Sequence, residues 1–147
     1  MSRRATIVNP AELGAPKGYS NGVLAPAGSQ LLFVAGQIGW DAGGKLVAGD
    51  FVAQFEQALA NVLAVVRAAG GGPHHVVRLT VYLVDRKAYL RSLSKVGEAY
   101  RRQMGRHFPA MAWVEVAGLM EPGAMVEVEA TAALPPEEPA AIDPREL

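Results

Sequence analysis

Residues 108–132 read FPAMAWVEVAGLMEPGAMVEVEATA and contain two runs in which residue character alternates with a period of two. Such alternation is typical of β-strands whose two faces meet different surroundings. The connection over residues 118–123 includes Pro122 and Gly123, which favour a loop. We therefore expect an antiparallel strand pair joined by a loop of several residues.

The two faces of this expected pair differ in chemistry. One face is small and aliphatic, which predicts that it packs against a core. The other face is expected to carry three glutamates, a tryptophan and two methionines, namely Glu115, Glu127, Glu129, Trp113, Met111 and Met125. Because this second face combines carboxylates with large apolar groups, we expect functional residues there.

Residues 50–69 have the clearest helical pattern in the chain. Apolar side chains recur there at the spacing of a buried helical stripe: Phe51, Phe55, Leu59, Val62, Val66 and Ala69. Asp50 is the expected N-cap, and the glycines and proline of residues 70–73 end the helix. A second amphipathic helix is predicted over residues 86–104.

Further strands are predicted from apolar or alternating segments at residues 5–8, 19–26, 30–38 and 75–85. Strand 30–38, helix 50–69 and strand 75–85 form a strand–helix–strand unit, so these two strands should be parallel. The element order predicts one α+β domain over residues 1–134, with a single mixed sheet and both helices on one face. The other face would then carry large apolar groups without a cover, which predicts self-association.

The composition narrows the possible functions. The 147 residues suffice for one domain with a core, and the absence of cysteine excludes disulfides, thiolate metal sites and a cysteine nucleophile. Fourteen basic and 14 acidic residues give zero net charge, whereas nucleic-acid binders carry strongly basic surfaces. Since no apolar run approaches about 18 residues and no signal peptide is evident, we expect a cytoplasmic protein without membrane contact.

The last segment, residues 135–147, differs from the rest in composition. It contains four prolines and four acidic residues. Such a segment buries little apolar surface, so we expect a disordered tail.

Five motifs resemble the RidA family, also called YjgF or L-PSP. They occur in the family's order at residues 34–38 (VAGQI), 57–61 (QALAN), 76–83 (VVRLTVYL), 108–110 (FPA) and 126–130 (VEVEA). The resemblance covers residues 15–134. It implies a chorismate-mutase-like fold, a homotrimer whose sheets form a central barrel, and small-molecule pockets at the subunit interfaces. It also implies hydrolysis of reactive 2-imino acids to keto acids and ammonia, without a metal or organic cofactor.

The resemblance also implies site residues. Tyr19 matches a pocket tyrosine, Gly36 a pocket backbone segment, and Glu127 the glutamate that positions the attacking water. The chain departs from the family at Met111, where the family has an arginine that clamps the substrate carboxylate. Arginine binds a carboxylate with two hydrogen bonds, whereas methionine offers only apolar contact. Arg106 is a nearby cation that could replace the clamp.

Each of these assignments has a plainer alternative. Glu127 could be a solvated carboxylate lining a trimer channel, and Arg106 could complement the negative end of a helix. Three functions stay open: an imine or enamine deaminase with a non-standard substrate, a non-catalytic metabolite-binding or regulatory trimer, and an endoribonuclease. The neutral charge and the lack of a cleavage constellation disfavour the ribonuclease. His74 and His75 have no third ligand at a suitable spacing, so no metal site is expected.

Overall fold

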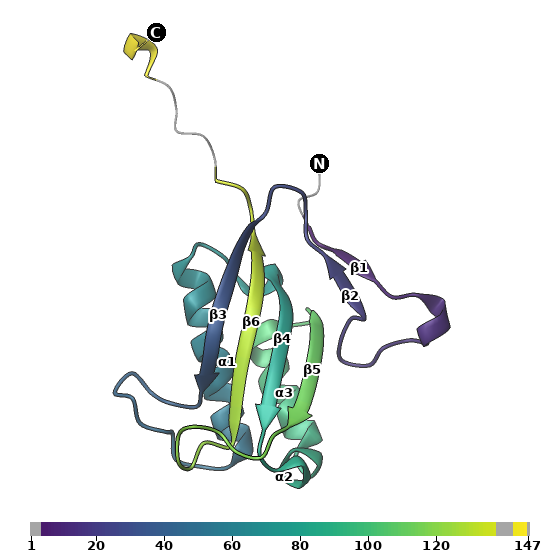
Figure 1. Ribbon diagram of the computed structural model, residues 1–147, viewed down its shortest axis with the longest axis vertical. Coiled ribbons are helices and arrows are strands. Elements are labelled where there is room, and N and C mark those ends of the chain that lie inside the picture. Colours follow the sequence, from purple (N-terminus) through teal and green to yellow (C-terminus); the bar gives the residue numbers. More distant parts are fainter. Residues whose placement is uncertain (1–3, 138–142, 147) are drawn as a thin grey trace.

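Four strands form one mixed sheet in the spatial order β3 (Gln30–Ile38), β6 (Val126–Leu134), β4 (Val76–Leu83) and β5 (Ala110–Glu115) (Figure 1). The structure is a computed structural model that describes residues 4–137 and 143–146. β6 runs antiparallel to both of its neighbours, and β4 is parallel to β5. The predicted mixed sheet is confirmed, and β3 is parallel to β4 as expected, although β6 lies between them.

The antiparallel pair predicted over residues 108–132 is wrong. β5 pairs with β4, and β6 lies in the middle of the sheet between β3 and β4. The reason lies in the side chains of β6, whose helix-facing residues are between 0 % and 6 % exposed: Val126, Val128, Ala130 and Ala132. A strand that buries such an aliphatic series is best placed centrally, with neighbours on both edges. β5 is shorter and belongs at the edge.

Met111 and Trp113 face the helices, which contradicts the prediction that they share a face with Glu127 and Glu129. In the register of β4 and β5, Met111 lies opposite Leu79 and Trp113 opposite Val81, and both β4 residues are buried. The Trp113 ring stacks on Tyr89 with 4.7 Å between the ring centroids. These two residues are therefore core contacts of an edge strand.

Glu127 and Glu129 point to the opposite side of the sheet. They lie opposite Tyr82 and Thr80 of β4, which alternate with that strand's buried residues. Met125 packs against the core, as Met111 and Trp113 do. Alternation fixes the two faces within a strand but not the phase of one strand relative to another, so the pattern alone wrongly assigned the two runs a common face.

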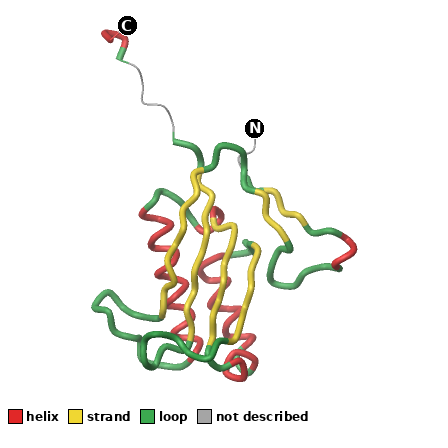
Figure 2. The backbone as a smooth tube through the Cα atoms, viewed as in Figure 1, coloured by secondary structure: helices red, strands yellow, loops and turns green. Residues whose placement is uncertain are grey.

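Helix α1 (Phe51–Ala68) confirms the predicted first helix. The Asp50 side chain caps it by accepting a hydrogen bond from the Ala53 N–H at 3.1 Å. Its predicted apolar stripe is buried from Phe51 through Val66, and the helix contacts β3, β6 and α3. The α-helices of the described residues lie on one face of the sheet, as predicted (Figures 1 and 2).

The second predicted helix is broken in two. α2 (Arg86–Leu90) and α3 (Leu93–Met104) are separated by a turn in which Ser92 has a non-helical backbone. The break changes the phase of the apolar stripe, so Leu93, which a continuous helix would bury, is 52 % exposed. It also allows Tyr89 on α2 to stack on Trp113.

The N-terminal strands form a separate arm instead of joining the main sheet. β1 (Thr6–Val8) and β2 (Gly22–Leu24) pair antiparallel and project beside β5, with the short 3-10 helix η1 (Ala11–Leu13) between them (Figure 1). Ser20 ties the arm to the sheet: its N–H donates to the Pro109 carbonyl at 3.1 Å, and its hydroxyl donates to the Phe108 carbonyl.

The face of the sheet opposite the helices carries large apolar side chains. Phe33 is 74 % exposed, Leu31 57 % and Val114 40 %. In the strand registers these residues share a side with Thr131, Ala133 and Tyr82. An uncovered apolar face was predicted and is present, but it is built from β3 and β5 residues instead of Met111, Trp113 and Met125.

The tail prediction for residues 135–147 falls partly on residues 138–142 and 147, which lie outside the described residues. Of the rest, the Pro135 carbonyl accepts a hydrogen bond from Gln30 Nε2 at 2.9 Å, and η3 (Pro144–Glu146) is a single turn. None of the helices in the described part of the chain is long and apolar enough to cross a membrane.

Candidate functional site

The Glu127 carboxylate lies directly on Gly36 of β3. A Cβ atom added to Gly36 would lie 2.8 Å from Glu127 Cδ and 2.9 Å from its Oε2. Such approaches are too short for any side chain, so glycine is required there unless Glu127 moves. The register of β3 and β6 shifts between Val34 and Gln37, and this irregularity holds Gly36 against the carboxylate. The structure thus brings together two residues that the sequence proposed for the site.

The other two strand glutamates are engaged elsewhere. Glu129 accepts a hydrogen bond from the Tyr82 hydroxyl at 2.6 Å, and this bond raises the pKa of Tyr82. Glu115 accepts a hydrogen bond from the Arg86 N–H at 2.7 Å at the start of α2. Both contacts explain these carboxylates structurally, which leaves Glu127 as the candidate for chemistry.

A hollow of about 470 Å³ lies between the loop before β2, helix α3 and strand β5. Met111 and Trp113 line it, together with four more aromatic side chains: Tyr19, Tyr89, Tyr100 and Phe108. Tyr100 stacks on Phe108 with 5.5 Å between centroids, and burial raises the pKa of Tyr100, so this residue is a neutral wall. The hollow therefore suits an apolar or aromatic group.

Two cations, Lys17 and Arg101, line the same hollow. Arg101 is in the last turn of α3, and a Cβ on Gly97 would lie 3.1 Å from its Nη1. The bare Gly97 therefore lets the guanidinium lie back along the helix into the hollow, one turn from its own Cα. None of the described residues that line this hollow is a carboxylate, so it favours an anion.

A smaller hollow of about 360 Å³ lies beside Tyr19 and is also lined by Met111, Asn21 and Arg78. The Asn21 side-chain nitrogen, Nδ2, is buried and has no hydrogen-bond partner within the described residues. A buried donor without an acceptor costs free energy, so such a group marks a place where a water, a ligand or another chain supplies one.

The structure divides the predicted site into two parts. Tyr19 and Met111 line common hollows at the edge of the sheet, and Gly36 and Glu127 meet on its open face. Neither hollow beside Met111 includes Glu127. Within one chain these are two separate places.

Comparisons with known proteins identify the group to which this architecture belongs. The sequence model of the family described as endoribonuclease L-PSP matches residues 10–134. The chain belongs to the RidA/YjgF/L-PSP family. It is 36 % identical over 129 residues to the 2-iminobutanoate/2-iminopropanoate deaminase of Capra hircus, which covers 87 % of this chain and 86 % of the relative.

Solved structures of the RidA family share the fold. The Rid-family protein YyfB from Yersinia pestis superposes with a TM-score of 0.78 at 34 % identity, covering 89 % of this chain and 99 % of that one. TdcF from E. coli, solved with bound serine, gives a TM-score of 0.61 at 31 % identity, covering 82 % and 91 %. The YjgF-like α+β fold predicted from the sequence is therefore confirmed.

The structure also places cations beside Met111 that the sequence analysis did not select for the site. Arg106 is exposed in the turn after α3 and lines neither hollow beside Met111, whereas Arg101 and Arg78 each line one. The sequence did contain one signal for Arg101, namely Gly97, a glycine inside an amphipathic helix one turn before it. Among the described residues, no group of three His, Asp or Glu side chains is arranged to hold a metal ion.

Proposed function

We propose that this protein is a hydrolytic deaminase of reactive imines or enamines, active as a homotrimer with pockets between neighbouring copies. The observation that carries the proposal is the Glu127 carboxylate seated on the bare backbone of Gly36. A carboxylate in this position can accept the proton of a water that attacks an imine carbon. Glu127 returns this proton to the nitrogen of the carbinolamine adduct, and loss of the hydroxyl proton as the C–N bond breaks releases ammonia and leaves a carbonyl product. The name of the Capra hircus relative supports the same reaction class.

The need for several copies follows from the separation of the two parts of the predicted site. Glu127 lies on the open face, while Met111 faces the helices at the edge strand. Packing the apolar open face of one copy against the edge of another would bury Phe33 and Leu31 and place a carboxylate beside a hollow. A central barrel made of such sheets is the assembly that we propose.

The substrate that we propose is larger and more apolar than 2-iminobutanoate. Met111 removes the arginine clamp, and five aromatic rings in all line the hollow. Arg101 supplies a positive charge from helix α3, so a carboxylate can bind there at a different position. The serine bound to the relative TdcF supports a ligand with an amino-acid-like carboxylate. We therefore infer an imine with an aromatic or branched side chain.

The test compares two imines generated in situ, one from threonine by a dehydratase and one from phenylalanine by an amino-acid oxidase, and follows formation of the keto acid. The wild type should accelerate the second reaction more than the first. Loss of two charge-assisted hydrogen bonds corresponds to roughly 10²–10⁴ in efficiency on the small imine, which Met111→Arg should partly restore. Glu127→Gln should abolish both activities.

Glu129→Gln is the matched control, because it makes the same change two residues along the same strand face. It should retain activity on both imines. Wild-type efficiency on the threonine-derived imine equal to that of an arginine-bearing relative would contradict the displaced clamp. In that case Arg101→Gln and Arg106→Ala would identify the cation responsible.

A non-catalytic metabolite-binding trimer is the second candidate, favoured by the single observation that Met111 replaces the clamp. It predicts saturable binding of the phenylalanine-derived keto acid without acceleration of either imine hydrolysis. Endoribonuclease activity is disfavoured because the net charge is zero, whereas nucleic-acid binders are typically strongly basic.

A further inference from the structure

The motif at residues 57–61 (QALAN) takes no direct part in the proposed reaction. It lies on helix α1, which covers the face of the sheet opposite the Glu127 carboxylate (Figure 1). Ala58 and Leu59 are buried in the core, whereas the polar residues Gln57 and Asn61 are only partly buried. Core packing explains the two apolar residues, and the two amides require an explanation of their own.

The Asn61 amide binds the end of strand β3. Its Nδ2 donates to the Ile38 carbonyl at 3.1 Å and to the Trp40 carbonyl at 2.9 Å. Its Oδ1 accepts a hydrogen bond from Gln57 Nε2 at 2.9 Å, which orients the amide with its nitrogen toward the two carbonyls. Ile38 is the residue that pairs with Glu127 in the strand register. Asn61 therefore holds the part of β3 that lies directly beside Glu127.

Side-chain hydrogen bonds continue from this strand end toward Gly36. Trp40 Nε1–H donates to Gln37 Oε1 at 3.4 Å, and Gln37 Nε2 donates to the Ala35 carbonyl at 3.1 Å. Ala35 and Gly36 lie in the irregularity between Val34 and Gln37, where the pairing with β6 is interrupted. The Gln37 side chain therefore supports the backbone immediately before Gly36.

Gln54, two turns earlier on the same helix, binds the segment that leads into β6. Its side chain is 5 % exposed and uses both ends of its amide: Nε2 donates to the Gly123 carbonyl at 3.1 Å, and Oε1 accepts from the Met125 N–H at 2.8 Å. Glu127 follows two residues later. A Cβ on Gly39 would lie 2.7 Å from Gln54 Cα, so the end of β3 also packs directly on the helix here.

We propose that Asn61 and Gln54 are positioning residues: from one helix they fix the end of β3 and the start of β6, and so hold Gly36 against Glu127. This role rests on the proposed function, because it affects catalysis only if Glu127 activates the water. Neither side chain reaches the open face, so both act through the backbone. Hydrogen bonds from a helix that is packed in the core are suited to holding reacting groups in place.

The kinetic test uses neutral replacements of similar size, Asn61→Leu and Gln54→Met, which remove the hydrogen bonds without burying a charge. Each should lower kcat for the phenylalanine-derived imine by about tenfold and change KM by less than about twofold, because the attacking water is misplaced while substrate binding is kept.

Gln103→Met is the matched control. Gln103 Nε2 makes the same kind of bond, to the Glu56 carbonyl at 2.8 Å, but this bond joins α3 to α1 and involves no strand. The control should lose a similar amount of stability and keep its kcat. This comparison separates positioning from a purely structural role.

Combining variants sharpens the kinetic test. Gly36→Ala already displaces the carboxylate, so adding Asn61→Leu to it should lower kcat by less than about threefold. Residues that act through the same contact are expected to be non-additive in this way. A full additional tenfold loss in the double variant would contradict the proposal.

The backbone amide signals of Gly36 and Glu127 test the geometry independently of activity. In nitrogen–proton correlation NMR spectra, both signals should shift in Asn61→Leu and in Gln54→Met, and both should stay in place in Gln103→Met. If the wild type accelerates the hydrolysis of neither imine, the proposed function fails, and these two signals alone then decide the positioning.

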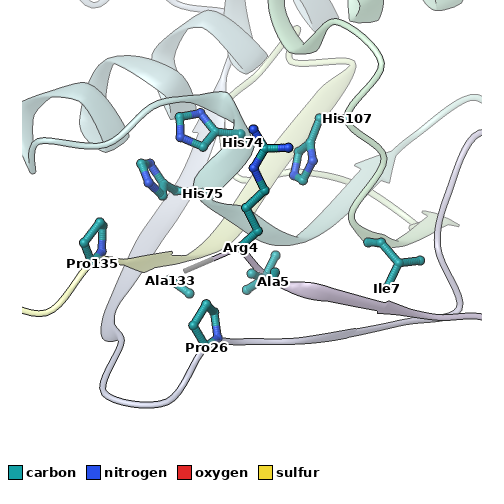
Figure 3. Close-up of a pocket in the computed structure, with 10 residues that line it drawn as sticks. Arg4, Ala5, Ile7, Pro26, His74, His75, His107, Ala133 and Pro135 are labelled. Carbon is teal, nitrogen blue, oxygen red and sulfur yellow. The ribbon is translucent and has the colours of Figure 1, made fainter. Parts of the chain in front are cut away.

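The three histidines of the chain provide a control for the fold as a whole. They line a cavity of about 510 Å³ beside η2 (Pro73–His75) and the end of β6: His74, His75 and His107 (Figure 3). Ala133 of β6 also lines this cavity, six residues from Glu127, which is about 20 Å along a strand. Their imidazole signals should therefore be unchanged in every variant that folds.

Three results would overturn the proposal: amide signals of Gly36 and Glu127 that respond to neither variant, a kcat that falls equally in Gln103→Met, or a loss that appears in KM instead of kcat. If Asn61→Leu and Gln54→Met do not fold, Gln57→Ala removes only the bond that orients the Asn61 amide. It should lower kcat by about threefold, and an unchanged kcat would then overturn the proposal.

Discussion

Two phenylalanines on opposite sides of the sheet show how differently the same residue is used. Phe55 on α1 packs between helix and sheet and is 1 % exposed, whereas Phe33 on β3 points away from the helices and is 74 % exposed. The helix side contains nearly all of the buried core, and the open side combines apolar groups with the Glu127 carboxylate. One side therefore supplies stability, and the other is available for association and chemistry.

Removing the buried ring should have the largest effect. Phe55→Ala should lower the free energy of unfolding by roughly 3–5 kcal/mol, because the fully buried ring leaves a cavity beside Trp113. Chemical denaturation measures the change. A loss below about 1 kcal/mol would show that the helix side is not the main source of stability.

Removing the exposed ring should instead change assembly. The wild type should sediment at about three times the chain mass of 15.5 kDa. Phe33→Ala should weaken that assembly by about 1.5–3 kcal/mol for each copy, the value of burying such a ring. Sedimentation equilibrium over a concentration series tests this. A wild type that stays monomeric, or a variant that associates as tightly, would contradict the assigned role of the open face.

A methyl group on Gly36 should affect chemistry more than stability. Gly36→Ala places a Cβ 2.8 Å from Glu127 Cδ, so the carboxylate must move and imine hydrolysis should fall by about tenfold or more. Gly118→Ala is the matched control, since its Cβ would have no neighbour within 4 Å. Equal activity of the two variants would remove Glu127 from the proposed mechanism.

The smallest expected effect concerns His75 and acid stability. Its pKa in the folded protein lies below the ordinary value of 6.5, so the unfolded chain takes up a proton first as the pH falls. The stabilisation from this group is present above about pH 6.5 and is lost as the pH falls through the lowered folded value. Thermal midpoints between pH 7.5 and 5.5 should therefore decline less for His75→Gln, and equal slopes would contradict the assignment.

The sequence predicted local elements better than it predicted their partners. Helix α1 and its Asp50 cap follow from spacing alone, and so does the alternation of β6. The central position of β6 could not be predicted in this way, because neighbouring strands are chosen by long-range packing, which local periodicity does not record. The same limit explains why Met111 and Glu127 were given one common face.

The family motifs supplied the candidate residues Gly36 and Glu127, but they did not indicate the cation that lines the hollow beside Met111. Gly36 and Glu127, each assigned to the site from a family motif, lie together because the strands that carry them are adjacent. Arg101 was missed, since its place in the hollow depends on the turn between α2 and α3 and on the missing side chain of Gly97. These depend on tertiary geometry, which one sequence does not contain.

The central position of β6 also determines when the protein can fold during synthesis. Among the strands of the described residues β6 comes last in the sequence, yet it lies between β3 and β4, which have no hydrogen-bonded contact with each other without it. A nascent chain that ends before residue 126 therefore exposes two unpaired strand edges, which invite association with other chains. The sheet is completed only when β6 inserts between β3 and β4. This pairing joins segments far apart in the sequence, so it is expected to be slow.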